Sequence, residues 1–371
     1  MKALSLLIKP ASGNCNMRCK YCFYADVMTL REVNNRGMMS LETLETIVKR
    51  AFEECTDFCT FGFQGGEPTL AGLDFFKTLI KFQNKYNKKN IPIMNTIQTN
   101  GSTIDADWAE FFFENKFLVG ISIDGTKEIH DYLRPDASGK GTFHQCIKSA
   151  QLLKKHKADF NILCVITRQV ARHPEKIYNF FKKHDFRYIQ LIPCLDGLKE
   201  EHGSNDYSLN SEAFGDFLKS LFDMWYQDFI QGNYYSIRTF DNYINLLLGN
   251  QPENCAMSGF CQSYPVIEAD GSVYPCDFYM LDEYRIGSVK TDSFETMLSG
   301  DTSENFAGIS HHIHEKCITC SYNFICRGGC RRDREPFVDG KPSLNYYCSS
   351  YMAFFEHALP RMQAIAGNIK K

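Results

Sequence analysis

Three cysteines near the N-terminus have the spacing of metal ligands. Cys15, Cys19 and Cys22 form a C-x3-C-x2-C motif just after the apolar run Leu4–Ile8. Thiolates normally cap all four irons of a cubane cluster, so a set of three would leave one iron open to a small molecule. Catalytic metal sites keep a position open in this way, whereas structural zinc sites are closed. A zinc knuckle with a distant fourth ligand and a chance spacing in a cysteine-rich chain are the alternatives.

A glycine-rich turn is the second feature that suggests chemistry. Gln64, Gly65, Gly66 and Glu67, followed by a proline, come directly after an apolar strand-like run. Paired glycines at the end of a strand let the backbone approach a ligand closely. Backbone carbonyls and Glu67 would then accept hydrogen bonds from a ligand ammonium group. An ordinary Gly-Gly turn is the alternative.

Eight more cysteines gather in the C-terminal part of the chain. Five of them lie between residues 317 and 348, which is more than one tetrahedral site holds. With three upstream cysteines they are enough for two closed sites of four thiolates each. Those sites would hold iron–sulfur clusters or, as the alternative, two zinc ions. The eight residues are Cys255, Cys261, Cys276, Cys317, Cys320, Cys326, Cys330 and Cys348.

Composition limits the function classes. The chain has 371 residues, is 44% hydrophobic and carries a net charge of −3 with the two signs mixed, so neither nucleic acid nor a membrane is expected as a partner. The apolar N-terminus is short and lacks a small-residue cleavage site, so we expect a cytoplasmic protein. We also expect a monomer. Cytoplasmic thiols stay reduced, which favours metal binding over disulfides. The five scattered cysteines are expected to be buried as small hydrophobic residues, and they are Cys55, Cys59, Cys146, Cys164 and Cys194.

Short apolar strands alternate with amphipathic helices through the first part of the chain. Six such units predict an α/β fold with a parallel sheet and right-handed crossovers. Six are too few for a closed eight-stranded barrel, so we expect a partial (β/α)6 TIM-like barrel with its site at the C-terminal ends of the strands. The expected strands are Leu4–Lys9, Thr60–Phe63, Ile93–Gln98, Leu118–Ile123, Phe160–Ile166 and Tyr188–Ile192. The expected helices are Leu41–Phe52, Leu73–Tyr86, Asp107–Asn115, Phe143–Lys155, Glu175–His184 and Ser211–Phe229.

The sequence changes character at about residue 234. Helical periodicity fades, Cys, Gly and Pro increase, and Pro265–Glu268 with Gly271–Tyr274 predicts a hairpin. A final helix is expected over Tyr351–Ile365, with Gly367 as its C-terminal cap. The expected domains are a barrel domain over 1–233, a cysteine-rich domain over 234–348 and a C-terminal helix over 349–371.

The cysteine triplet after the first strand and the Gly-Gly-Glu-Pro turn after the second together resemble the radical S-adenosylmethionine (SAM) enzymes. Tyr21, just before the last cysteine of the triplet, also fits their pattern. The resemblance implies that the open iron chelates SAM and that one-electron reduction yields a 5′-deoxyadenosyl radical. The SAM contacts that the resemblance implies are Tyr21, Gly65, Gly66, Glu67, Ser122, Arg134 and Leu195. For Arg134, the alternative is a surface arginine beside Asp131 and Asp136.

The C-terminal cysteines resemble the SPASM extension of that superfamily, which carries two auxiliary [4Fe–4S] clusters. The resemblance implies three [4Fe–4S] clusters in all, and a closed cluster is suited to take an electron from a substrate radical. It implies that one auxiliary cluster is bound by Cys255, Cys261, Cys276 and Cys330, and the other by Cys317, Cys320, Cys326 and Cys348.

From end to end the chain is similar to the anaerobic sulfatase-maturating enzymes. The resemblance implies oxygen-independent oxidation of a cysteine or serine, in a Cys/Ser-x-Pro/Ala-x-Arg motif of an unfolded sulfatase, to Cα-formylglycine. It implies Asp277 as the base, Tyr24 and Gln64 in the substrate channel, and a flavodoxin- or ferredoxin-type electron donor. For Asp277, bonding to the backbone near a cluster is the alternative. The shared stretches are LSLLIKP (4–10), FQGGEPTLAGL (63–73), FNILC (160–164), GSVYPCDFY (271–279) and LNYYC (344–348).

Two other functions use the same features. SPASM peptide maturases cross-link ribosomal peptides through thioether or carbon–carbon bonds, but they often carry an N-terminal recognition domain, for which a first strand at residue 4 leaves no room. A three-cluster electron-transfer protein would need no open iron.

Overall fold

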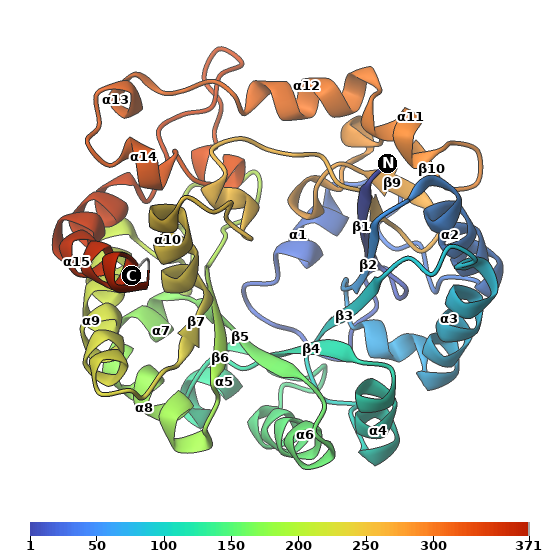
Figure 1. Cartoon of the computed structure of the whole chain (residues 1–371), viewed down its shortest axis with the longest axis horizontal. Helices are drawn as coiled ribbons and strands as arrows, with labels where there is room; N and C mark the ends of the chain where they lie inside the picture. The colour runs from blue at the N-terminus through green and yellow to red at the C-terminus, as the bar shows by residue number, and fades with distance from the viewer. Residues whose placement is uncertain (370–371) are drawn as a thin grey trace. The chain divides into compact units, whose positions relative to one another are not determined.

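The computed structural model describes residues 1–369 (Figure 1). These residues form two compact units, each assembled from separate segments of the chain. The first unit contains residues 1–123, 134–160 and 263–306, and the second contains 124–133, 161–262 and the residues from 307 onward. These units are defined by packing and combine segments that are distant in the sequence, so they do not test the domain boundaries expected at 233 and 348. Those boundaries stay a prediction.

The first unit is built on a sheet with the strand order β10-β9-β8-β1-β2-β3-β4. Strands β1 to β4 run parallel, and β8 adds to β1 in parallel with Leu7 beside Val266. The β8–β9 and β9–β10 pairs are antiparallel, as the predicted hairpin requires. The strands are β1 (Ala3–Ile8), β2 (Phe58–Phe63), β3 (Ile93–Thr99), β4 (Phe117–Ser122), β8 (Val266–Ile267), β9 (Ser272–Tyr274) and β10 (Gly287–Ser288).

Helices cover this sheet because each presents an apolar stripe to it. In α2, Leu44, Ile47 and Val48 are fully buried, and the side chain of Ser40 caps the helix by accepting from the Thr43 N–H. Figure 1 shows α2 and α3 beside β1 to β3, and the two helices contact each other. The helices with most of their residues in this unit are α1 (Phe23–Thr29), α2 (Leu41–Glu54), α3 (Leu73–Tyr86), α4 (Ala106–Glu114), α6 (Phe143–His156), α11 (Phe294–Leu298) and α12 (Asp301–Ile309).

The second unit contains three parallel strands and the long C-terminal helix. The ring of Phe354 in α15 packs against those of Phe222 in α9 and Phe240 in α10, which also contact each other. Its strands are β5 (Phe160–Ile166), β6 (Tyr188–Pro193) and β7 (Ser236–Ile237). Its helices are α5 (Lys127–Leu133), α7 (Arg168–Ala171), α8 (Pro174–His184), α9 (Ser211–Ile230), α10 (Arg238–Leu248), α13 (Glu315–Ile318), α14 (Asn323–Cys326) and α15 (Cys348–Ile369). Short 3-10 turns occur at Pro68–Ala71, Cys255–Met257, Asp277–Tyr279, Asp282–Tyr284 and Arg331–Arg334.

The six predicted strands and six predicted helices all exist, with ends that differ by a few residues at most. Two expectations about the C-terminal part are wrong. Gly367 lies inside α15 rather than capping it, since a glycine with ordinary helical geometry costs a helix only about 1 kcal/mol. Helical structure also does not fade at residue 234, because α10 follows and buries Phe240, Tyr243 and Ile244 before Gly249 ends it at a φ of +90°.

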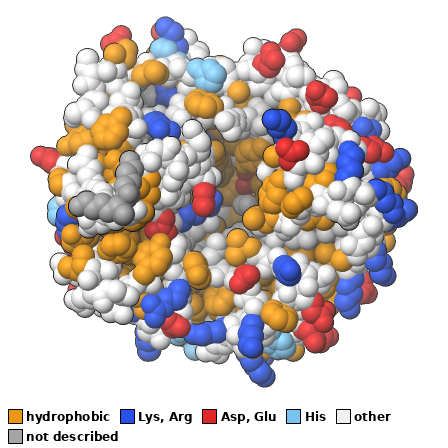
Figure 2. Space-filling view, viewed as in Figure 1, with side chains coloured by type: hydrophobic (Ala, Val, Ile, Leu, Met, Phe, Trp, Pro, Cys, Tyr) orange, Lys and Arg blue, Asp and Glu red, His pale blue; other side chains and the backbone are white. Residues whose placement is uncertain are grey.

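The surface agrees with the mixed charge of the sequence. On the face drawn in Figure 2, acidic and basic side chains are interspersed. Within residues 1–369, no helix is both long enough and apolar enough to span a bilayer.

Candidate active site

The cysteine triplet lies in the segment that joins β1 to α1. Cys22 is the residue before α1, and its N–H donates to the carbonyl of Cys19, so these two cysteines share one tight turn. The Cys15 sulfur accepts from the Met17 N–H at 3.4 Å and contacts the Asn100 amide at 3.8 Å. Burial raises the pKa of the Cys15 thiol, so its thiolate form needs a cation beside it. Iron bound at this segment would supply that cation.

Solvent access separates the predicted ligand cysteines from the others. All sixteen cysteines lie within residues 1–369 and none forms a disulfide there, and the eleven predicted ligands are all at least partly accessible. The other five are no more than 2% exposed, which confirms them as core residues. Among residues 1–369, no three His, Cys, Asp or Glu side chains are close enough together to hold a single metal ion. Cluster thiolates each bind a different iron, so they need not converge on one point.

The glycine turn packs against the cysteine segment itself. The Gly66 N–H donates to the Ser12 carbonyl and the Glu67 N–H to the Asn14 carbonyl, each at 2.8 Å. A Cβ on Gly66 would lie only 2.1 Å from the Asn14 oxygen, so only glycine permits this approach. The sequence predicted that the glycine turn approaches a ligand closely. In the structure, the turn closely approaches the backbone of the residues that lead into Cys15.

Glu67 is fully buried and holds the turn in place. Its Oε1 accepts from the N–H of Thr69 and from the hydroxyls of Thr69 and Thr99, and its Oε2 accepts from the Asn100 N–H. Burial raises its pKa despite these bonds. The carboxylate thus ties the end of β2 to the end of β3, and its predicted contact with SAM stays a prediction.

The other predicted SAM contacts divide between the two units. Arg134 is 6% exposed and donates to the hydroxyl of Tyr21 at 2.7 Å, so it is not a solvent-exposed surface arginine. The Ser122 hydroxyl accepts from the Gln98 amide at 3.0 Å. These residues share the first unit with the cysteine triplet, whereas Leu195 lies in the second unit.

Asp277 is buried, with charged and polar side chains on both of its oxygens. The Lys9 ammonium lies 2.5 Å from Oδ1, and the Gln64 amide donates to Oδ2 at 3.2 Å. Asp277 is 6% exposed, and Lys9 is fully buried. Gln64, predicted in the substrate channel, therefore contacts the predicted base directly. Lys9 was not predicted, although a lysine directly after a buried strand is a signal that a counter-ion is needed.

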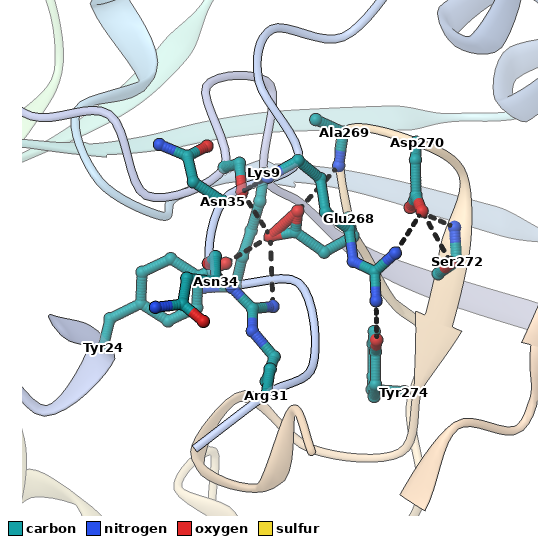
Figure 3. Close-up of polar contacts among 12 residues, drawn as sticks. Lys9, Tyr24, Arg31, Asn34, Asn35, Glu268, Ala269, Asp270, Ser272 and Tyr274 are labelled. Atoms are coloured by element: carbon teal, nitrogen blue, oxygen red, sulfur yellow. Dashed lines mark hydrogen bonds and ion pairs between the residues drawn. The ribbon is translucent and has the colours of Figure 1, made fainter. Parts of the chain in front are cut away.

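The hydroxyl of Tyr24 is occupied inside the protein. It donates to Glu268 Oε1, which the Arg31 guanidinium also approaches at 3.6 Å. The Tyr24 ring lies under the Lys9 ammonium, 4.0 Å from the ring centroid. Figure 3 shows these side chains around Glu268. Burial first, and then the charge of Glu268, raises the pKa of the Tyr24 hydroxyl well above its usual value.

Four of the C-terminal cysteines gather within the second unit. Cys317 lies within α13, Cys320 follows it, Cys326 ends α14 and Cys348 begins α15. Burial raises the pKa of Cys326 to about 11, and the thiols of the other three contribute to the shift, so all four lie within electrostatic reach of one another.

The second predicted set is divided between the units. Cys255, Cys261 and Cys330 belong to the second unit and Cys276 to the first, so the common site of these four stays a prediction.

Two family models match the chain. The model of the radical SAM superfamily matches residues 10–181, and that of an iron–sulfur cluster-binding domain, SPASM, matches residues 255–321. Together with the fold and the partly accessible cysteines, these matches define a radical SAM protein with an iron–sulfur extension. They favour iron–sulfur clusters over zinc in both parts of the chain.

Relatives match over the whole length. The cysteine-type anaerobic sulfatase-maturating enzyme of Clostridium novyi is 50% identical, over 99% of this chain and 98% of that protein. The serine-type enzyme of Bacteroides thetaiotaomicron is 33% identical, over 97% of this chain and 91% of its own length. A solved structure of native anSMEcpe with bound AdoMet and the Cp18Cys peptide matches with a TM-score of 0.95 and 48% identity, covering 99% of each chain.

The chain belongs to the anaerobic sulfatase-maturating enzymes. The predicted family and fold class are thereby confirmed. The predicted cofactors, SAM and [4Fe–4S] clusters, agree with the family models and with the AdoMet in the matching structure.

Proposed function

We propose that this chain oxidises a cysteine in an unfolded sulfatase polypeptide to Cα-formylglycine without molecular oxygen. One observation carries the proposal: the buried carboxylate of Asp277 lies in the same compact unit as the three-cysteine segment. A base is thus available in the unit that would generate the radical. The relatives described above support the choice of substrate.

The chain's own residues would hold four groups, namely three iron–sulfur clusters and SAM. Cys15, Cys19 and Cys22 would hold the cluster with the open iron, and Tyr21, Arg134, Ser122, Leu195 and the turn over 65–67 would hold SAM. The eight C-terminal cysteines would hold the two closed clusters. When bound, these groups supply a 5′-deoxyadenosyl radical for hydrogen-atom abstraction and an acceptor for one electron.

Asp277 removes the proton that the radical chemistry leaves behind. Loss of one Cβ hydrogen atom, one thiol proton and one electron converts the –CH2–SH group into a thioaldehyde, –CH=S. Water then replaces the sulfur, which gives the aldehyde and releases hydrogen sulfide. Gln64 and Lys9 contact the carboxylate of Asp277 on its two oxygens, and these contacts would orient it to accept the thiol proton.

A cysteine target is favoured over serine. The cysteine-type relative shares 50% of its residues with this chain and the serine-type relative shares 33%. A thiol is also the more acidic group, so its proton reaches a carboxylate more readily than that of a serine hydroxyl. The substrate is an extended segment with the pattern Cys-x-Pro-x-Arg or Cys-x-Ala-x-Arg.

The protein's surroundings are part of the proposal. Sixteen cysteines, none of which forms a disulfide within residues 1–369, support a reducing compartment, the cytoplasm. A low-potential one-electron carrier of the flavodoxin or ferredoxin type would supply the electron that cleaves SAM. We propose that the enzyme works as a monomer.

The test is anaerobic incubation with SAM, a reductant and a peptide that contains Cys-x-Pro-x-Arg. We expect about twelve irons per chain, four for each cubane, and a peptide mass loss that matches conversion of a thiol to an aldehyde. In Asp277→Asn we expect SAM cleavage to continue while aldehyde formation falls by a factor of about 100 or more. Full-rate conversion by Asp277→Asn would show that another group is the base. A thioether or carbon–carbon cross-link as product would instead support a peptide cross-linking maturase.

A further inference from the structure

We propose that Lys9 is a positioning residue for this reaction: its ammonium group fixes the orientation of the Asp277 carboxylate, while Tyr24 and Glu268 hold Lys9 in place. The proposal rests on the proposed function, in which Asp277 accepts the substrate proton.

Asp277 is the counter-ion of the buried Lys9. The Lys9 side chain is 0% exposed, and its ammonium lies 2.5 Å from Oδ1 of Asp277. Within residues 1–369, Asp277 is the one carboxylate within ion-pair distance of the Lys9 nitrogen. Burying an unpaired ammonium is far more costly than burying a paired one, so the two groups are held together strongly.

The backbone of Lys9 is pinned at the junction between the cysteine segment and the hairpin that precedes Asp277. Its N–H donates to the Ile267 carbonyl in β8 at 2.9 Å, and its carbonyl accepts from the Ser12 N–H at 3.2 Å. The Cβ that Gly65 lacks would lie 3.2 Å from the Lys9 Cβ. The Lys9 side chain therefore starts from a backbone position that is fixed between the cysteine segment and the hairpin. A positioning residue needs such a fixed starting point.

Tyr24 and Glu268 hold the other end of the lysine. The Tyr24 ring supports the ammonium through a cation–π contact with 4.0 Å between nitrogen and centroid. The ring cannot turn away easily, because its hydroxyl donates to the fully buried Glu268. Glu268 accepts in turn from the Ser12 hydroxyl at 3.2 Å. Arg31 and the N–H of Ala269 also contact it (Figure 3).

The resulting arrangement holds Asp277 from two sides. Lys9 fixes Oδ1, and Gln64 fixes Oδ2 through a single neutral donor at 3.2 Å. Without the ammonium, only that weaker bond would orient the carboxylate. A displacement of about 1 Å can lower a rate about 100-fold, so an unfixed base would lose much of its effect without any change in SAM cleavage.

The experiment measures formylglycine formed per 5′-deoxyadenosine released, in fully iron-loaded enzyme. We expect Lys9→Met to lower this ratio about 10- to 100-fold through kcat, with the peptide KM changed less than about threefold. Lys9→Arg should recover part of the ratio, because a guanidinium can pair with the same carboxylate. Lys85→Met is the matched control, since it removes an exposed lysine that is 2.7 Å from Glu45 in the same unit, and its ratio should not change.

Tyr24 provides a second test that leaves both members of the ion pair in place. Tyr24→Leu removes the ring beneath the ammonium and should lower the ratio, whereas Tyr24→Phe keeps the ring and should retain more of it. If Lys9→Met fails to load iron, the Tyr24 variants decide the question.

The outcomes separate this proposal from the assignment of the base. A normal ratio in Lys9→Met, or in Tyr24→Leu when Lys9→Met does not load iron, overturns the role of Lys9. A parallel loss of SAM cleavage and product in loaded Lys9→Met also overturns it, because that is a general structural effect. If Asp277→Asn lowers the ratio and Lys9→Met does not, the proposed function stands and the inference fails. If Asp277→Asn keeps a normal ratio, the base assignment itself is wrong.

Discussion

Replacing Gly66 by alanine should release the cysteine segment from the glycine turn. The new Cβ would lie 2.1 Å from the Asn14 oxygen, whereas an ordinary contact needs at least 3.4 Å, so the two segments must separate by about 1.3 Å. That separation breaks the backbone bonds from Gly66 to Ser12 and from Glu67 to Asn14. Bonds of this kind are worth about 1 kcal/mol each, and overpacking adds about 1–3 kcal/mol. We therefore expect a local loss of about 3–5 kcal/mol, concentrated at the residues that lead into Cys15.

Two measurements on anaerobic, reconstituted protein test this expectation. The iron content should fall from about twelve to about eight per chain, because only the cluster at Cys15, Cys19 and Cys22 depends on the turn. The urea midpoint should also fall. The control is Gly308→Ala in α12, where a Cβ meets nothing within 4 Å and a better helix former replaces glycine. Twelve irons and an unchanged midpoint in Gly66→Ala would refute the steric reasoning.

Four further substitutions test the proposed cluster ligands, a proposed SAM contact and a helix cap. Cys22→Ala should lose about four of twelve irons. Cys59→Ala, in the core, should keep all of the iron and instead lower the urea midpoint. Equal iron loss in the two variants would contradict the division of the cysteines by solvent access. Arg134→Gln removes the donor to Tyr21, so we expect the KM for SAM to rise about tenfold, and an unchanged KM would exclude a SAM contact. Ser40→Ala removes the cap of α2 and should cost about 1 kcal/mol in urea unfolding with no change in iron content.

The helices and strands could be predicted because their signals are local, and the proposed metal ligands rest on a local signal of the same kind. Runs such as Phe160–Ile166 are continuous and apolar, and the structure has that strand with the same bounds. Ligand cysteines are recognised by spacing, and their partial accessibility agrees with it. Gly367 was assigned wrongly because a glycine near the end of a helix is a cap only where the backbone turns left-handed, and α15 continues through it.

The environment of the proposed base, Asp277, could not be predicted, because it depends on pairing between distant segments. Lys9 and Asp277 are 268 positions apart, and they meet because β8 adds to β1 in a register that sets Ile267 beside Ile8. Sequence spacing contains no information on that register. The position of the Tyr24 hydroxyl depends on the same pairing, since its partner Glu268 directly follows β8.

The pairing of β1 with β8 explains how one unit can combine radical generation with proton removal. The chain leaves β1 at Lys9 and within six residues reaches Cys15, while β8 leads through its hairpin to Cys276 and Asp277. The first segment carries the proposed ligands of the open cluster, and the second carries the proposed base next to a proposed ligand of an auxiliary cluster. Both are anchored on adjacent strands, so displacement of one strand would disturb hydrogen abstraction and deprotonation together. The overall rate therefore does not distinguish residues that position the proposed base from residues that affect radical formation. The ratio of product to cleaved SAM is the measurement that distinguishes them.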